Sequence, residues 1–158
     1  MKRSSTVFLK AVILLIGIGV VTGMILFPQI EGRNANSDLV SIYLRDPLLA
    51  YTYIASIPFF VALYQAFRML GYIEQKKAFS QSSVRALRNI KYCAIVLIGF
   101  IVAGEAFIIV GGEGDRAGIV ALGIYTTFAS IVIATTAAIF ERLLQNAVDL
   151  KSENDLTI

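Results

Sequence analysis

The side chain most capable of chemistry in this sequence is Glu105, a carboxylic acid inside an apolar run. It lies five residues before Val110, where the run ends. In a helix that rises ~1.5 Å per residue, this places it about 7 to 8 Å inside the run. An ionised carboxylate is costly in a lipid environment, so Glu105 should face other helices. It is either a proton- or ion-handling group or a protonated, hydrogen-bonded structural contact, and the sequence leaves both interpretations open.

Partners for Glu105 can be proposed by matching its depth along the other apolar runs. Side chains able to form hydrogen bonds at that depth are Thr22, Tyr53, Tyr125 and Thr126. These residues and Glu105 form the candidate intramembrane polar site.

Most catalytic chemistry is excluded by composition. The chain has no histidine and no tryptophan, and its single cysteine is Cys93. It therefore lacks the ligands for a zinc or iron site, a Ser-His-Asp or Cys-His arrangement and an internal disulfide. One buried carboxylate is too little for general acid-base catalysis. We expect no enzymatic activity, no metal and no cofactor.

The elements that must position Glu105 are four long apolar runs, at about residues 8–27, 48–70, 92–110 and 118–140. Each is close to the ~20 residues that a helix needs to cross ~30 Å of hydrocarbon. Hydrophobic residues make up 57% of the chain, and 158 residues leave no room for a separate catalytic domain. The sequence predicts one all-α integral membrane domain, an up-down-up-down four-helix bundle in the lipid bilayer.

The distribution of basic residues predicts the orientation of the bundle. If both termini lie on one side, that side holds eleven of the 14 lysine and arginine residues, and the other side holds Arg33, Arg45 and Arg116. Basic residues favour cytoplasmic loops. Both termini are thus expected in the cytoplasm of a bacterium with the protein in its plasma (inner) membrane. No A-x-A site follows the first run, which we interpret as an uncleaved signal anchor.

Three of the helices are expected to continue beyond the membrane. The second and third should form a cytoplasmic hairpin over residues 71–91, in which Ser80 is placed as an N-cap for a helix starting near Gln81. The fourth should continue into the tail at residues 141–158. Within the bilayer, small residues four apart favour close helix packing or dimerisation, at Gly19 and Gly23 and along Ser130, Ala134 and Ala138.

The hairpin and the tail together form a candidate partner-binding surface. Apolar positions continue at helical spacing past the membrane, where lipid no longer requires them. Arg85 and Arg88 of the hairpin set the topology and contact anionic lipid, or they take part in binding the partner. The candidate partner-binding residues are Arg85, Arg88, Leu143, Leu144, Ala147, Val148, Asp149 and Asp155.

The whole chain, and above all its C-terminal run from Phe140 to Ile158, resembles domain-of-unknown-function family 2975. The Phe79-Ser80 turn followed by Val84, Leu87 and Arg88 also resembles that family's middle loop. The resemblance implies a small bacterial membrane protein without an established activity, so no catalytic residue carries over. Such proteins are commonly encoded beside a small helix-turn-helix regulator of the Xre type, which suggests a DNA-binding protein as partner.

Two functional hypotheses follow. The first is a regulatory or anchoring protein that binds a cytoplasmic helix-turn-helix regulator and does not itself bind nucleic acid. The second is a small transporter or channel subunit in which Glu105 handles protons or cations. Against the second, the sequence shows no pair of broken helices, no charged pore ring and no inverted repeat. The oligomeric state is left open.

Overall fold

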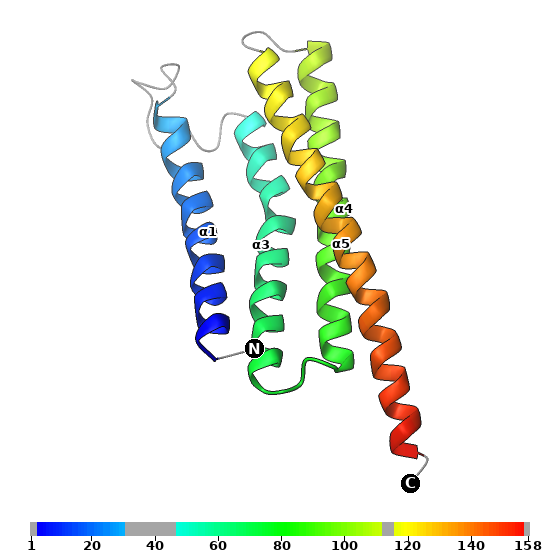
Figure 1. The fold of residues 1–158 in the computed structure, drawn as a ribbon. Helices are drawn as coiled ribbons and strands as arrows, with labels where there is room; N and C mark the ends of the chain where they lie inside the picture. Colours follow the sequence, from blue (N-terminus) through cyan, green and yellow to red (C-terminus); the bar gives the residue numbers. More distant parts are fainter. Residues whose placement is uncertain (1–2, 31–46, 112–115, 157–158) are drawn as a thin grey trace.

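The computed structural model describes residues 3–30, 47–111 and 116–156, and places side chains for residues 5–26, 49–111 and 117–154. The described helices are α1 (Arg3–Ile30), α3 (Pro47–Glu74), α4 (Gln81–Gly111) and α5 (Arg116–Leu156). All four are long and apolar enough to cross a membrane, and they alternate in direction (Figure 1). The predicted all-α membrane fold is confirmed.

The helices pack in the order in which they follow one another along the chain. Helix α4 has the most extensive contacts, with α5 and then with α3, whereas α1 contacts α3. Within the described ranges no other pair of helices packs to a comparable extent. The bundle is therefore open on the side of α1, which stands apart from α4 and α5 in Figure 1.

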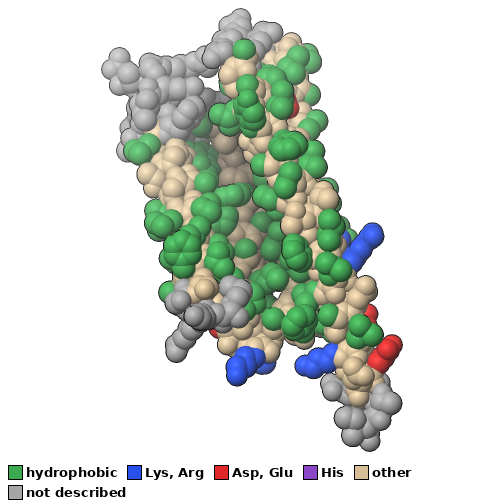
Figure 2. Space-filling model, in the orientation of Figure 1, with side chains coloured by type: hydrophobic (Ala, Val, Ile, Leu, Met, Phe, Trp, Pro, Cys, Tyr) green, Lys and Arg blue, Asp and Glu red, His purple; other side chains and the backbone are tan. Residues whose placement is uncertain are grey.

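Many more apolar residues lie on the surface of the bundle than in its interior. Large apolar side chains are exposed on every helix, including Phe8, Ile54, Phe107 and Phe128. Figure 2 shows hydrophobic side chains along most of the visible face. The buried apolar residues of the described part are Val84, Ala86, Leu87, Ala94 and Ala137. A surface of this kind requires lipid as its surroundings, because water would leave it as a large exposed apolar patch.

Small residues bring neighbouring helices close at Ser130, as expected from the sequence, and also at Gly104, which the sequence analysis did not single out. Ser130 of α5 is 4% exposed, and the ring of Tyr51 lies 3.0 Å from where a Cβ on Gly104 would be. A Cβ on Gly19 or Gly23 would meet nothing within 4 Å. The predicted glycine pair of α1 therefore packs against no described helix of this chain.

The turn between α3 and α4 is built from backbone hydrogen bonds. The N–H of Lys77 donates to the carbonyl of Tyr72 at 2.8 Å, and that of Lys76 to Ile73 at 3.1 Å. This pair of bonds is a Schellman motif, with Lys76 in the left-handed region at φ 58°. Helix α4 then starts at Gln81 as predicted, and Ser80 caps it by accepting from the N–H of Ser83.

Helix α5 is much longer than a membrane requires. Its 41 residues correspond to about 60 Å at ~1.5 Å per residue, against ~30 Å of hydrocarbon. In Figure 1 its C-terminal part runs past the turn between α3 and α4. We call this end of the molecule the basic end, because every lysine and arginine whose side chain is described lies on the half of its helix toward it or in the α3–α4 turn, whereas Arg116 starts α5 at the opposite end. These residues are Lys10, Arg68, Lys76, Lys77, Arg85, Arg88, Lys91, Arg142 and Lys151.

Candidate functional site

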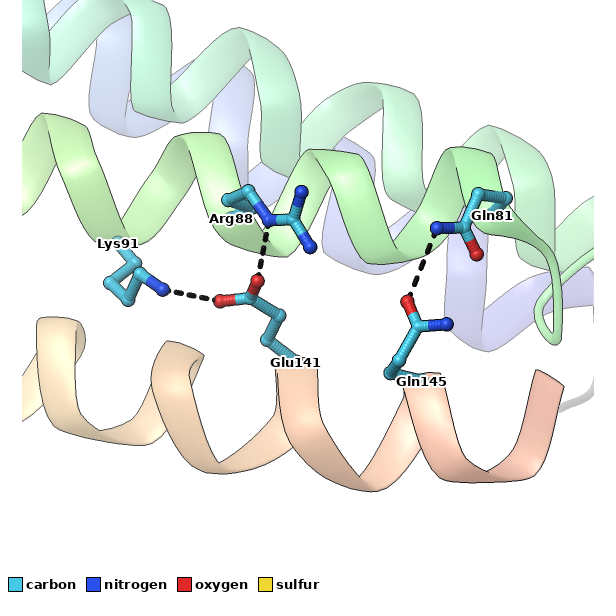
Figure 3. A network of polar contacts seen from close by, with 5 residues as sticks. All are labelled: Gln81, Arg88, Lys91, Glu141 and Gln145. Carbon is cyan, nitrogen blue, oxygen red and sulfur yellow. Dashed lines mark hydrogen bonds and ion pairs between the residues drawn. The ribbon is translucent and has the colours of Figure 1, made fainter. Parts of the chain in front are cut away.

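The carboxylate of Glu141 joins α4 to α5 at the basic end (Figure 3). Its Oε1 accepts a hydrogen bond from Nε of Arg88 at 2.6 Å, and its Oε2 accepts one from Nζ of Lys91 at 2.6 Å. Because Arg88 and Lys91 are three residues apart, they extend from the same face of α4. Glu141 is 8% exposed, so both of its oxygens are satisfied in a largely dry position.

The two cations change the acidity of Glu141, which directly follows the apolar span that we predicted to end at residue 140. The hydrogen bond from Lys91, and then that from Arg88, hold the pKa of this carboxyl below its ordinary value, while burial opposes them. Ionised glutamate is therefore the form that the site favours. Charge-assisted hydrogen bonds of this length are the strong ones in proteins.

A second polar contact joins the same helices one turn further along α5. Nε2 of Gln81 donates to Oε1 of Gln145 at 3.2 Å, and Gln145 donates in turn to Asp149 at 2.8 Å. We call the five residues drawn in Figure 3 the α4–α5 polar seam: Gln81, Arg88, Lys91, Glu141 and Gln145. The seam fixes the register of α5 against α4 at the point where α5 leaves the bundle.

At the same end, α1 is attached to α3 by a separate ion pair. Nζ of Lys10 contacts Oε2 of Glu74, and the same ammonium lies 5.4 Å from the centre of the Phe67 ring. Both partners are partly exposed, and the contribution of such a pair is about 0 to 1 kcal/mol. This contact therefore positions α1 but does little to stabilise it.

Glu105 occupies a second site, between α4 and α5 in the half of the bundle away from the basic end. A Cβ on Gly123 would overlap its carboxyl oxygen Oε1 and lie 2.6 Å from its Cδ. Oε1 is buried and has no hydrogen-bond partner among the described residues. The carboxyl lines a cavity of about 250 Å³ that also includes Thr52 and Thr126. The prediction that Glu105 faces other helices rather than lipid agrees with this placement.

The proposed partners of Glu105 are placed in different surroundings. Only Thr126 shares its cavity, and the hydroxyl of Thr126 donates to the carbonyl of Leu122 in its own helix. Thr22 lines a groove between α1 and α3. Tyr125 is 75% exposed, and the hydroxyl of Tyr53 donates to the carbonyl of Met24. Depth alone could not indicate which face of each helix these residues occupy.

The candidate partner-binding residues also separate. Arg88 is held by Glu141, whereas Arg85 lies exposed on α4. On α5, Leu143 is exposed, Leu144, Ala147 and Val148 are half-buried, and Asp149 is exposed and accepts from Gln145. The side chain of Asp155 lies outside the described residues.

Sequence reasoning missed Glu141 and Gly123. Glu141 is the first charged residue after the fourth apolar run, and Arg88 with Lys91 precedes the third run at a comparable depth. That match of depth and opposite charge was the available signal for the ion pair. No comparable signal marked Gly123, which is one of 12 glycines in the chain.

Matches to known proteins extend over nearly the whole chain, including all four described helices. The family model described as "Protein of unknown function (DUF2975)" matches residues 5–158. The uncharacterized membrane protein YoaS of Bacillus subtilis (strain 168) is 45% identical over 160 residues, which is 100% of both chains. No solved structure matches the chain. The similarity therefore includes α5 beyond Glu141 as well as the apolar spans.

Proposed function

The chain belongs to the DUF2975 family of proteins of unknown function, and we propose that it is a membrane anchor whose projecting α5 binds a small helix-turn-helix protein. The observation that carries this proposal is the pair Leu143 and Leu150, which are 59% and 62% exposed on the part of α5 that follows Glu141. They are seven residues apart, so they lie on one face of the helix, with Ala147 between them. An apolar face outside the hydrocarbon is a binding surface for protein.

The α4–α5 polar seam supports this role, because its contacts at Glu141 and Gln145 hold α5 against α4 where the exposed face begins. A helix fixed in this way presents its leucines without the entropic cost of ordering a free segment. The helix-turn-helix class of partner is suggested by the family resemblance and is therefore an inference by association. The residue types available, with no histidine and one cysteine, favour a binding protein over an enzyme.

We also propose that the basic end faces the bacterial cytoplasm, where a DNA-binding partner would be. The support for this orientation is the excess of lysine and arginine at that end. It requires that the opposite ends of the helices face the exterior of the plasma membrane.

The test is co-purification of the detergent-solubilised full chain with the helix-turn-helix protein encoded beside it. Leu143→Asp with Leu150→Asp should abolish binding, because both substitutions place a charge on the apolar face. Ser152→Asp is the matched control, since Ser152 is exposed on the same helix but outside that face. Truncation after Asn146 should also abolish binding while leaving the seam intact. Retention of the regulator by the leucine double variant, or its failure to bind the intact chain, would show the proposal to be wrong.

A second candidate function is favoured by Oε1 of Glu105, which lies beside its cavity without a hydrogen-bond partner in the described part of the chain. A carboxyl with a free acceptor inside a span is suited to taking up a proton or cation. This function predicts pH-driven flux in proteoliposomes that is lost in Glu105→Gln. Flux that survives the substitution, or no flux above that of empty liposomes, would leave Glu105 with a structural role.

A further inference from the structure

A separate polar pocket lies between α3 and α4 at the basic end. It has a volume of about 180 Å³ and is lined by two facing helical stripes: Gln65, Arg68 and Tyr72 of α3, and Ser82, Arg85, Ala86 and Asn89 of α4. The spacing of three and four residues in each stripe places these residues on single helix faces. Buried Ala86 is its one apolar residue, so the lining consists almost entirely of groups that can donate hydrogen bonds.

The charge of this pocket is not balanced. The lining contains two arginines and no aspartate or glutamate. Among the described residues the ion pairs use Lys10, Arg88 and Lys91, so Arg68 and Arg85 have no acidic partner there. Two arginines therefore line one pocket whose other lining residues supply no counter-charge, which is the arrangement of an anion site.

Arg68 is held in place on its own helix. Its Nη2 donates to the hydroxyl of Tyr72 at 2.6 Å, and its guanidinium lies 5.8 and 5.7 Å from the ring centres of Tyr64 and Tyr72. Because the Tyr72 oxygen accepts from Arg68, its own proton is available to a further acceptor in the pocket. The donors thus include two guanidiniums, two hydroxyls and two carboxamides, and a phosphate group offers only acceptors.

We propose that this pocket binds the phosphate group of an anionic phospholipid headgroup in the leaflet at the basic end. Arg68 lies two residues before the predicted end of the second span, at residue 70, and Arg85 lies in the hairpin just outside the bilayer. Their pocket is therefore at headgroup depth, where basic pockets between membrane helices receive lipid phosphates. Arginine suits this ligand because its planar fork can bind two phosphate oxygens at once.

The experiment is native mass spectrometry of the full chain, delipidated in dodecyl maltoside and then titrated with phosphatidylglycerol or phosphatidylcholine. Phosphatidylglycerol should bind at one preferred site, and Arg68→Gln with Arg85→Gln should weaken it about tenfold or more, because charge-assisted hydrogen bonds are lost. Both arginines are exposed, so the variant should fold, which its elution on size exclusion verifies.

The matched control is Arg142→Gln with Lys151→Gln, which removes the same charge from exposed residues of α5 outside the pocket. Its affinity for phosphatidylglycerol should stay within about twofold of the parent, since the pocket is unchanged. Equal weakening in the two double variants would show general charge attraction, and equal binding of phosphatidylcholine would show no preference for an anionic headgroup. Either result would overturn the site.

Two soluble probes, inorganic phosphate and glycerol phosphate, distinguish the source of the phosphate. If the lipid is the ligand, neither should displace phosphatidylglycerol at millimolar concentration. Displacement by either probe, or binding of that probe alone in a manner that depends on Arg68 and Arg85, would show that a soluble phosphate occupies the pocket and that the lipid assignment is wrong.

Discussion

At the scale of single residues, Glu141 is the group on which the contact between α4 and α5 most depends. It accepts from both Arg88 and Lys91 in a position that is 8% exposed. Glu141→Gln keeps the size of the side chain but leaves two cations without their counter-charge. We expect a loss of about 2 kcal/mol in the free energy of unfolding, measured by chemical denaturation in detergent. Asp149→Asn, on an exposed part of α5, should change it by less than about 0.5 kcal/mol.

The same substitution should show a defined pH dependence. Because Lys91 and Arg88 lower the pKa of Glu141 in the folded protein, its stabilising effect is complete above the ordinary glutamate pKa of about 4.3. It is lost as the pH falls through the lowered folded pKa. The stability difference between the parent and Glu141→Gln should therefore be constant near neutrality and shrink in acid. A difference that instead grows in acid would contradict an ionised Glu141.

Gly123 leaves room for the carboxyl of Glu105, because a Cβ at residue 123 would overlap it and the side chain would have to move. Gly123→Ala should destabilise the protein by about 1 to 2 kcal/mol through overpacking. In a Glu105→Ala background the same change should cost much less, since the obstructing carboxyl is gone. Gly99→Ala is the control, because its Cβ would meet nothing within 4 Å. Equal costs for Gly123→Ala in both backgrounds would mean that Glu105 is not what Gly123 accommodates.

What could be predicted from the sequence at this scale was residue type and depth. A carboxylate inside a span must face protein rather than lipid, so the inward position of Glu105 followed from solvation alone. The rotation of each helix could not be derived in the same way, because all faces of these spans are apolar and their pattern barely distinguishes inside from outside. For that reason, the depth of Tyr125, which matches that of Glu105, did not reveal that its side chain is 75% exposed.

At the scale of elements, the α3–α4 turn contains a residue in an unfavourable conformation. Lys76 takes the left-handed position of a Schellman motif, at φ 58°, which glycine usually occupies because it has no Cβ. Lys76→Gly should therefore raise the free energy of unfolding by about 0.5 to 1 kcal/mol. Lys77→Gly, at a residue without positive φ, should lower it by a similar amount. Thermal unfolding of both variants in detergent checks the difference.

The end of a helix could be predicted from the sequence where a side chain nearby in the sequence caps it with a hydrogen bond. The start of α4 at Gln81 was predicted from Ser80, and the structure shows Ser80 capping that helix. The Schellman turn carries no glycine, so its position gave no comparable signal. Pairwise contacts such as that of Gln81 with Gln145 depend on how two helices slide against each other, which no local pattern records.

At the scale of the whole molecule, the position of the protein in the bilayer must place its apolar surface in lipid and its charged groups in water or among headgroups. Apolar side chains are exposed along all four helices, so lipid has to surround them, and the charged groups then mark where the bilayer ends. Glu141 with Arg88 and Lys91 lies at this boundary on α4 and α5, and Lys10 with Glu74 lies there on α1 and α3. From the predicted ends of the spans, we therefore expect these two sets of ion pairs to border the membrane on one side.

The orientation that these charges predict can be tested with single cysteines in a Cys93→Ala background. Because basic residues are retained on the cytoplasmic side, cysteines at Ser82 and Ser152, both exposed at the basic end, should not react with a membrane-impermeant maleimide in intact cells. Cysteines at Ser37 and Gly114, in the loops predicted to face outward, should react. Lysis of the cells should make the cysteines at Ser82 and Ser152 reactive, which verifies that the maleimide can reach them once the membrane is open. Labelling of Ser82 or Ser152 before lysis would reverse the topology and place the projecting end of α5 where no DNA-binding partner could reach it.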